Sequence, residues 1–489
     1  MSDSAPEIRA PQTPAAPDFV RGFCPAGRRP LLLAACILAS ALGFIDGSVV
    51  SIAIPAMRET LGASLPQAQW ISNAYMLALS ALILVGGGAG DRFGLARVFS
   101  IGIALFVAAS LLCAAAPTAG WLIAARTVQG CGAALMIPGS LALIARAYPE
   151  AERGRAIGIW AAASSLTTAA GPIIGGAALS FGGPEFWRAI FAVNLPLGLA
   201  AIWMIRRAVA DDPGHAGHRL DIPGAALAVA GLGLLALSLT AGGDLPLRIG
   251  LAAAGLLALA AFLRVEARSP APMLDLALFR NHSFSAANVL TFFLYFSLSA
   301  ITFFLPMLLI AAWGITELIA TIAFAPLSVF IPLMSATAGR LSDRYGPARP
   351  IAAGSALVAL AYAGLALTVG WRDFWTTLLP LMALMGFGMS LVVAPLSTAV
   401  MRGVAEGNTG AASGVNNAVS RVAGLVAVAA MGSVAALAYG AAGGPASYGD
   451  TLADPAHVTA SGTAFAVIAW TTAAMAAASA AVAWIGLRR

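Results

Sequence analysis

The chain has 489 residues, of which 60 % are hydrophobic and only 10 % are charged. A soluble globular domain carries about 25 % charged residues, so this composition excludes a water-facing surface of matching size. All 27 basic residues are arginines, and they gather in short loops between apolar runs, which excludes a basic nucleic-acid-binding face. The sequence therefore predicts an all-α polytopic membrane protein without a nucleic-acid partner.

Fourteen apolar runs follow in chain order, each long enough to cross about 30 Å of hydrocarbon. Residues 1–30 are polar, rich in proline and alanine, and have no signal-peptide core, so we expect a disordered cytoplasmic tail. The predicted spans are 31–54, 68–90, 97–116, 119–146, 155–180, 187–205, 222–242, 247–264, 285–311, 317–338, 350–370, 374–400, 408–437 and 462–486.

Arginine counts predict the orientation of these spans. An even number of spans puts both termini on one side, and the tails and loops of that side hold twenty-one arginines. The opposite loops hold four, and Arg126 and Arg421 fall inside spans. Because cytoplasmic loops are enriched in arginine, we expect both termini in the cytoplasm and the protein in the inner or plasma membrane.

The first span contains the stretch GFIDGSVV, which places Asp46 within a hydrophobic run. Of the 21 acidic residues, Asp46 alone lies well within a predicted span. An ionised carboxylate at such depth costs several kcal/mol or takes up a proton, which is the property of a proton carrier. The alternative is a structural carboxylate paired with Arg126 or held by Ser48 and Asn73, and both roles are compatible.

Two loops repeat one pattern. GGAGDRFGLAR (87–97) follows the second span and GRLSDRYGPAR (339–349) follows the tenth. We expect the glycines to allow close approach and tight turns, the aspartates to accept helix amides or pair with arginines, and the arginines to hold the loops at the inner face. An ordinary polar turn is the alternative, and two copies in equivalent places argue against it. The shared positions are Gly87, Asp91, Arg92, Gly94, Arg97, Gly339, Asp343, Arg344, Gly346 and Arg349.

This repeat predicts two related six-helix halves with two extra helices between them. We place the first half at 31–210, an inserted two-helix linker at 211–270 and the second half at 271–489. Parallel halves of this kind occur in a large class of secondary transporters, whose substrate site lies near the midplane between the halves.

These features together resemble the major facilitator superfamily, specifically its fourteen-span drug:proton antiporter branch. The first loop matches the family's signature, although Leu95 and Ala96 replace residues that are commonly basic. RTVQGCGAA in the fourth span resembles the motif with a membrane-embedded arginine, here Arg126. Three runs also match in order: FIDGSVVSIAIP, QWISNAYML and FWRAIFAVNLPLG, with GNTGAASGVNNAVSR resembling the branch's thirteenth span.

AAGPIIGG in the fifth span resembles the antiporter motif, and Ala163 and Thr167 replace its upstream glycines. In the family this motif forms a close helix contact that seals the outward side of exporters. The resemblance also implies that Asp46 couples to protons and that Arg126 biases the pKa of this acid; a structural Arg126 that holds helix carbonyls is the alternative. The matching motif residues are Gly171, Pro172, Gly175 and Gly176.

Aromatic, methionine and amide side chains within the spans are candidates for substrate binding, because soft side chains suit varied amphipathic ligands. Most aromatic side chains in membrane helices face lipid or line the interface, so packing is favoured over ligand contact for any single one of them. Arg421 lies deep in the second half without a nearby acid and could face an anionic or polar substrate; neutral and anionic substrates fit as well as cations. The candidates are Trp70, Asn73, Tyr75, Met136, Trp160, Phe292, Phe293, Tyr295, Phe296, Phe303, Met307, Met389, Asn416 and Arg421.

The predicted function is proton-coupled export of drugs or other amphipathic small molecules by alternating access. The alternative is a proton-coupled transporter of one specific metabolite or natural product, in either direction. The expected partners are the substrate, protons and membrane lipids, with a monomer as the expected state. The proton gradient is the expected energy source, and no cofactor is expected.

Other classes of function lack the residues they need. An intramembrane enzyme is not supported, since the four histidines lie outside the predicted spans and the motifs HExxH and GxSxG are missing from the sequence. The phosphate loop GxxxxGKS needs a lysine, and the chain has none, which excludes an ATP-driven pump and a nucleotide partner. No metal site is expected, and a leak channel stays open as an alternative.

Overall fold

The computed structural model describes residues 22–210, 212, 214, 221–241, 244–269, 272–402, 404 and 409–488. Within these ranges every regular element is a helix, as the composition predicted. Most of the predicted tail 1–30 and part of the predicted linker 211–270 lie outside the described residues.

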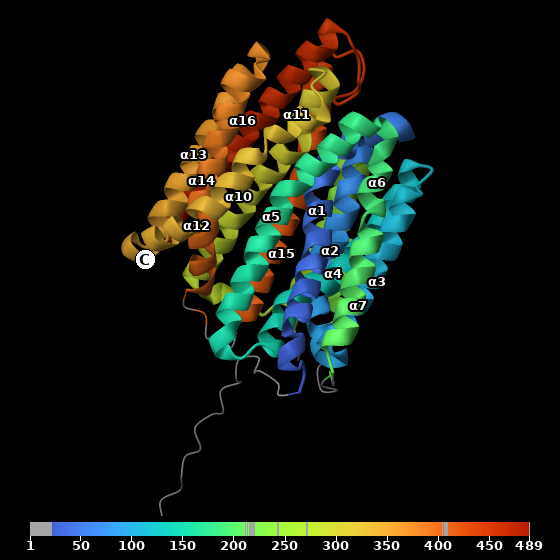
Figure 1. Cartoon of the computed structure of the whole chain (residues 1–489). Helices are drawn as coiled ribbons and strands as arrows, with labels where there is room; N and C mark the ends of the chain where they lie inside the picture. Colours follow the sequence, from blue (N-terminus) through green and yellow to red (C-terminus); the bar gives the residue numbers. More distant parts are fainter. Residues whose placement is uncertain are drawn as a thin grey trace, which may run out of the picture.

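The first half of the chain forms one group of helices, coloured blue to green in Figure 1. Its long helix α1 ends at Leu61, beyond the predicted end at residue 54, because Gly62 ends it with a left-handed backbone (φ 59°). The elements are η1 (Ala26–Arg28), α1 (Arg29–Leu61), α2 (Leu65–Phe93), α3 (Leu95–Ala114), α4 (Ala119–Ala147), α5 (Glu150–Gly182), η2 (Pro184–Phe186), α6 (Trp187–Ala192) and α7 (Asn194–Ala208).

The second half forms a matching group, coloured yellow to red, beside the first (Figure 1). The two extra helices, α8 (Ile222–Thr240) and α9 (Leu245–Glu266), precede it in the chain. Its elements are η3 (Leu276–Arg280), α10 (His282–Met307), η4 (Leu308–Ala312), α11 (Glu317–Ile322), α12 (Ala325–Tyr345), α13 (Ala348–Thr368), η5 (Val369–Trp371), η6 (Phe374–Leu378), α14 (Leu379–Met401), α15 (Thr409–Ala441) and α16 (Pro455–Gly486).

Two predicted spans are each broken into two helices, and proline explains both breaks. Span 187–205 is α6 followed by α7, and span 317–338 is α11 followed by α12. Pro196 and Pro326 each lie four residues after the last residue of the preceding helix. Because proline has no amide hydrogen, it cannot bond to the carbonyl four residues before it, so each helix ends there.

The helix count agrees closely with the predicted fourteen spans. Thirteen helical stretches in the described part of the chain are long and apolar enough to cross a membrane. The span missing from these thirteen is 155–180, which lies inside α5, a continuous helix of 33 residues. Within α5, the segment Gly171–Gly182 is apolar but shorter than the thirteen stretches. The predicted fold, with two six-helix groups and an added central pair, is confirmed.

Small residues bring the helices of each half into close contact. A Cβ at Gly86 of α2 would lie 2.0 Å from the Ala134 carbonyl oxygen of α4. In the second half, a Cβ at Gly354 of α13 would lie 2.4 Å from the Gly388 carbonyl oxygen of α14. Such close backbone approach is the usual basis of helix packing in membranes, where lipid is as apolar as leucine.

Two seams join the halves. In one seam α2 packs against α15, and α8 of the extra pair contacts both of these helices. In the other seam α5 packs against α11 and α12, while α1 packs against α10 between the two seams. The first helices of the two halves therefore face each other at the centre of the molecule.

Candidate transport site

Asp46 lies midway along α1, and its side chain is buried, with 1 % of the residue exposed. Arg126 of α4 is 2 % exposed and donates from Nη1 to both carboxylate oxygens of Asp46, at 2.8 Å to Oδ1 and 2.6 Å to Oδ2. An ionised acid and a guanidinium in contact have no net charge, which lowers the cost of holding either one within the membrane.

Gln129, three residues after Arg126 on the same helix, completes this pair. Its Nε2 donates to Asp46 Oδ1 at 3.0 Å and to Ser110 Oγ at 2.9 Å, and its Oε1 accepts from Arg126 Nη1 at 2.5 Å. Ser110 Oγ also accepts from Asn194 Nδ2 at 3.1 Å. The network thus joins α1, α3, α4 and α7, and all of its members are buried.

Of the two residues that the sequence suggested as holders of Asp46, Asn73 does not fill that role in the structure. Both polar side-chain atoms of Asn73 are buried without a hydrogen-bond partner, and the side chain of Ser48 lies outside the described residues. Gln129 occupies the position beside the acid instead. It was visible in the sequence, because residues three apart lie on one face of a helix.

Arg126 is also held by groups of α2. Its Nε donates to the Ile71 carbonyl oxygen at 3.1 Å, and its guanidinium lies 4.3 Å from the centre of the Tyr75 ring. Tyr75 is 2 % exposed and interacts electrostatically with Asp46, Arg126 and Arg421. Tyr75 thus links the buried pair of the first half to an arginine of the second half.

Arg421 lies on α15 and is partly exposed. It interacts electrostatically with Tyr75 of α2 and Tyr295 of α10. Asn416 of the same helix donates from Nδ2 to Asn288 Oδ1 at 3.2 Å and to Thr291 Oγ1 at 2.8 Å, both on α10. Arg421 therefore lies on the helix that packs against both α2 and α10, and Asn416 fixes α15 against α10.

The other substrate candidates are placed differently. Trp70 donates to Thr240 Oγ1 of α8 at 2.8 Å, so it contacts the extra pair, and Trp160 donates to Ser40 Oγ of α1 at 2.9 Å. Phe292 packs against Phe293 and Phe296 along α10. The remaining candidates are almost completely buried in the hydrophobic cores, which favours packing over ligand contact: Met136, Phe303, Met307 and Met389.

Close contacts between the halves occur at the end of the molecule that the arginine counts predict to be outer. A Cβ at Gly176 of α5 would lie 2.5 Å from Thr321 Cγ2 and 2.8 Å from the Glu317 carbonyl oxygen of α11. Ser180 Oγ donates to Glu317 Oε2 at 3.1 Å and accepts from the Leu318 amide at 3.0 Å. A Cβ at Gly175 would lie 2.2 Å from Val49 Cγ1 of α1.

The remaining residues of the antiporter motif, Gly171 and Pro172, are buried in α5. Pro172 has no amide hydrogen to donate, and α5 continues as one helix through it. Glycines at 175 and 176 leave room for α1 on one side and α11 on the other, so the motif lies where the halves touch.

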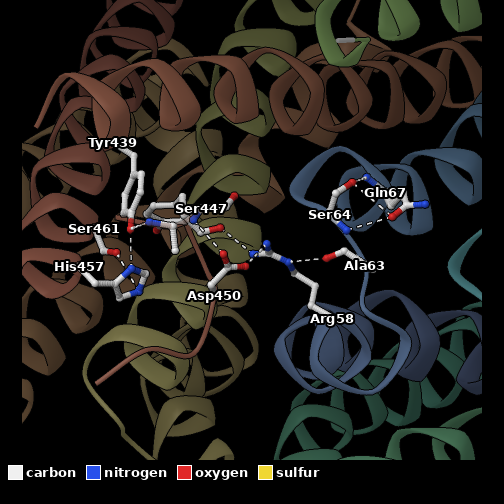
Figure 2. Close-up of polar contacts among 11 residues, drawn as sticks. Arg58, Ala63, Ser64, Gln67, Tyr439, Ser447, Asp450, His457 and Ser461 are labelled. Atoms are coloured by element: carbon white, nitrogen blue, oxygen red, sulfur yellow. Dashed lines mark hydrogen bonds and ion pairs between the residues drawn. The ribbon is translucent and has the colours of Figure 1, made fainter. Parts of the chain in front are cut away.

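A second contact at this end joins Arg58, near the end of α1, to the loop between α15 and α16 (Figure 2). Arg58 donates to the Tyr448 carbonyl oxygen at 2.6 Å, to Asp450 Oδ1 at 2.5 Å and to the Ala63 carbonyl oxygen at 3.1 Å. Burial lowers the pKa of the Arg58 guanidinium, and the Asp450 carboxylate partly offsets this effect. The sequence did not predict this contact, because Tyr448 and Asp450 lie in a loop that shares no motif with α1.

The same loop is held on its own half by Tyr439 and His457 (Figure 2). Tyr439 hydroxyl lies 2.6 Å from His457 Nδ1 and accepts from the Ala446 amide at 3.2 Å. His457 is buried in the first turn of α16, which begins at Pro455 rather than at the predicted residue 462. The prediction that all four histidines lie outside the spans is therefore wrong for His457, because Asp454 caps α16 early, and His282 is the first residue of α10.

The two repeated loops share one geometry at the end that is predicted to be inner. Gly94 and Gly346 both have positive φ, 98° and 78°, which a side chain would disfavour. The arginine before each aromatic lies over its ring, Arg92 at 5.1 Å from Phe93 and Arg344 at 5.2 Å from Tyr345. The glycine turn and the stacked arginine explain why the pattern occurs twice.

Other expectations for these loops differ from the structure. Asp91 and Asp343 are exposed and make no hydrogen bond within the described residues. Asp212, which follows α7 in the chain, caps α3 at the first loop instead. It accepts from the Ala96 amide at 2.6 Å and from Arg146 Nη1 at 3.3 Å. Nothing lies within 4 Å of a Cβ at Gly87 or Gly339, so the close approach is made by Gly86, the neighbour of Gly87. The arginines at 97 and 349 are exposed.

No cluster of candidate metal ligands was found among the described residues. The buried polar groups that the structure brings together are instead an ion pair, its amide partner, two tyrosines and a second arginine. This set can hold or release a proton and can bind a polar group, and it contains no activated nucleophile.

Comparison with known proteins identifies the family. The chain matches the Major Facilitator Superfamily over residues 36–428. It is 34 % identical over 408 residues to the methylenomycin A resistance protein of Bacillus subtilis, across 81 % of this chain and 86 % of that protein. It is 31 % identical over 411 residues to the tetracenomycin C resistance and export protein of Streptomyces glaucescens, across 81 % of this chain and 74 % of that protein.

The fold agrees with solved structures of transporters. A bacterial homologue of the human lysosomal transporter Spinster, in an inward-facing and unoccupied conformation, matches with a TM-score of 0.71 and 18 % identity, across 95 % of this chain and 98 % of that one. The chain therefore belongs to the major facilitator superfamily, as a multi-pass membrane transporter without enzymatic activity whose relatives include antibiotic-resistance proteins.

Proposed function

We propose that this secondary transporter exports drugs or other amphipathic small molecules in exchange for protons, with Asp46 as the acid that carries the proton. The observation that supports this proposal is the burial of Asp46 against Arg126 and Gln129, at the centre of the first half. Export is favoured over uptake because a relative is named for resistance and export.

Protonation of Asp46 would remove the negative charge that holds Arg126 in place. The guanidinium would keep its bond to the Ile71 carbonyl oxygen and its contact with the Tyr75 ring. Both of these groups belong to α2, which packs against α15 of the second half. A shift of the Arg126 side chain after protonation of Asp46 would therefore act on the seam between the halves. Proton binding can thereby favour one arrangement of the halves over the other.

Alternating access requires the contacts at the predicted outer end to separate. These are the approach of Gly176 to Thr321, the bond between Ser180 and Glu317, and the bonds from Arg58 to the loop before α16. The proposed cycle opens these contacts to release substrate and accept a proton, then closes them again.

Growth protection in a pump-deficient host tests the coupling role. Cells expressing the wild type should tolerate a toxic substrate that inhibits cells with Asp46→Asn at equal protein level. Asp244→Asn is a matched control, because this exposed acid makes no capping bond at the start of α9. Full protection by Asp46→Asn that still collapses without a proton gradient would exclude Asp46 as the coupling acid.

Everted vesicles test the exchange itself. Adding substrate should dissipate a preformed proton gradient in wild-type vesicles and leave it intact in Asp46→Asn vesicles. Accumulation of substrate by intact cells would instead support the second candidate, uptake of a specific metabolite.

A further inference from the structure

Arg126 of the first half and Arg421 of the second lie within predicted membrane spans, and only one of the two charges is balanced within the described residues. Arg126 is paired with Asp46. Arg421 forms no ion pair and no hydrogen bond within the part of the chain that the structure describes. Since an uncompensated charge in a helix centre costs several kcal/mol, its presence is expected to serve a function.

The surroundings of Arg421 direct it toward the junction of the halves. It interacts electrostatically with Tyr75 from the first half and with Tyr295 from α10 of the second. Helix α15, which carries Arg421, packs against α2, whose Tyr75 touches Arg126 of the proposed coupling pair. In transporters built from two parallel halves, substrates bind at this depth and at this junction.

The hydrogen-bonding state of Arg421 indicates an absent partner. Its Nε is buried without an acceptor. The terminal nitrogens Nη1 and Nη2 are not among the buried atoms without a partner, and the residue as a whole is partly exposed. The nearby amide Asn416 donates to Asn288 and Thr291 and stays engaged with α10. The guanidinium is therefore a free and charged donor group on α15 in the described structure.

The chemistry of a guanidinium defines what it would bind. It is always charged, and its planar set of donors matches a carboxylate with two parallel bonds. An anionic oxygen next to Nε would satisfy the buried donor and neutralise the charge together. Tyr295, a partly exposed side chain of α10, offers an aromatic face for the apolar body of the same molecule on a helix that packs against α15.

We propose that Arg421 binds an acidic group of the transported compound where α15 packs against α2 and α10, so that the substrates of this protein are amphipathic organic acids. This inference rests on the proposed export function and specifies its substrate class. Exchange of a monoanion outward for one proton inward moves the equivalent of two positive charges inward. Transport should therefore respond to the membrane potential as well as to the pH gradient.

The test compares 1-naphthoic acid with its methyl ester, as probes that differ in one charge. Binding to the purified full-length protein in phosphatidylcholine nanodiscs would be measured for the wild type, Arg421→Gln and Arg421→Lys. We expect the wild type to prefer the acid, and Arg421→Gln to bind it about 10-fold to 100-fold more weakly with ester binding unchanged. Arg421→Lys should retain part of the preference, because it keeps the charge and loses the planar geometry.

Several outcomes would overturn the inference. Equal binding of acid and ester by the wild type, or an acid preference that survives in Arg421→Gln, excludes the proposed contact. Displacement of the acid by added phosphatidylglycerol, without acid transport in vesicles, would assign the arginine to lipid headgroups instead. Thermal unfolding of each variant checks that the fold is intact.

A separate measurement distinguishes this failure from failure of the proposed function. If Asp46→Asn abolishes substrate-driven proton release while acids and esters bind equally, the transporter is proton-coupled and only the substrate class is wrong. If Asp46→Asn has no effect while the acid preference depends on Arg421, the coupling acid is wrong and the binding site stands.

Discussion

The buried arginines of the two halves differ in what surrounds them. Arg126 touches an acid, an amide, a carbonyl oxygen and an aromatic ring, so its charge and donors are used within the protein. Arg421 has two tyrosines near it and no carboxylate partner in the described residues. The same residue type, at similar depth, is thus suited to internal coupling in one half and to ligand contact in the other.

The largest expected effect is on the free energy of unfolding when the charge of Arg126 or of Arg421 is removed, because the two substitutions should change it differently. Arg126→Gln leaves Asp46 buried without its partner and should destabilise the protein by about 3–5 kcal/mol. Arg421→Gln removes an unpaired charge and should be neutral within about 1 kcal/mol or stabilising. Thermal unfolding in detergent measures both.

The double variant Asp46→Asn with Arg126→Gln is the control for this comparison, because it removes the pair together. Its stability should recover most of the loss. Equal destabilisation by Arg126→Gln and Arg421→Gln would show that Arg421 has a partner in the folded protein and would end the contrast between the halves.

A packing variant tests whether Arg126 depends on the contact of α2 with α4. Gly86→Ala forces a Cβ to within 2.0 Å of the Ala134 carbonyl oxygen, so the helices must separate. We expect a loss of about 1–3 kcal/mol and lower transport. Gly87→Ala is the matched control, since nothing lies within 4 Å of its Cβ. Similar unfolding temperatures for the two variants would contradict this close approach.

The amides of the two halves allow a smaller comparison. Gln129→Ala removes a donor to an ionised acid and should cost about 1.5–3 kcal/mol, whereas Asn416→Ala removes bonds between neutral groups and should cost about 0.5–1.5 kcal/mol. The difference should be seen in chemical unfolding of the purified variants. A larger cost for Asn416→Ala would mean that the contact of α15 with α10, rather than the buried pair, dominates stability.

The smallest effect is expected at the outer contact of the halves. Arg58→Ala should cost about 1 kcal/mol, because its partner Asp450 is 38 % exposed at the side chain and screened by water. The variant should shift the protein toward an outward-open state. A cysteine at Thr321, with the native cysteines replaced by alanine, should then react faster with an impermeant maleimide. Unchanged labelling would remove Arg58 from the set of gate contacts.

Much of the fold was predictable from local sequence. Apolar runs fixed the spans, and Asp46 and Arg126 stood out because charged residues are rare within those runs. Helix ends were less accurate, since caps such as Gly62 and Asp454 extend α1 and α16 into polar segments. Hydropathy alone cannot register such caps, because they act through one or two hydrogen bonds.

Long-range partners could not be predicted in the same way. Asp91 and Asp212 are both aspartates in polar loops, and only the folded chain shows that Asp212 is the one that caps α3. Arg58 and Asp450 are 392 residues apart and carry no shared pattern. Periodicity reports which face of a helix is apolar and not which helix covers that face, so these contacts need the structure.

The extra helices make the two seams between the halves unequal. α8 contacts both α2 and α15, and its Thr240 accepts from Trp70 across this seam. At the seam formed by α5 with α11 and α12, the helix that contacts both α5 and α11 is α1 of the first half, and the extra pair makes no comparable contact there in the described structure. An apolar compound dissolved in the bilayer therefore meets a covered joint on one flank and an uncovered one on the other, so lateral entry from the lipid is expected on the α5 side.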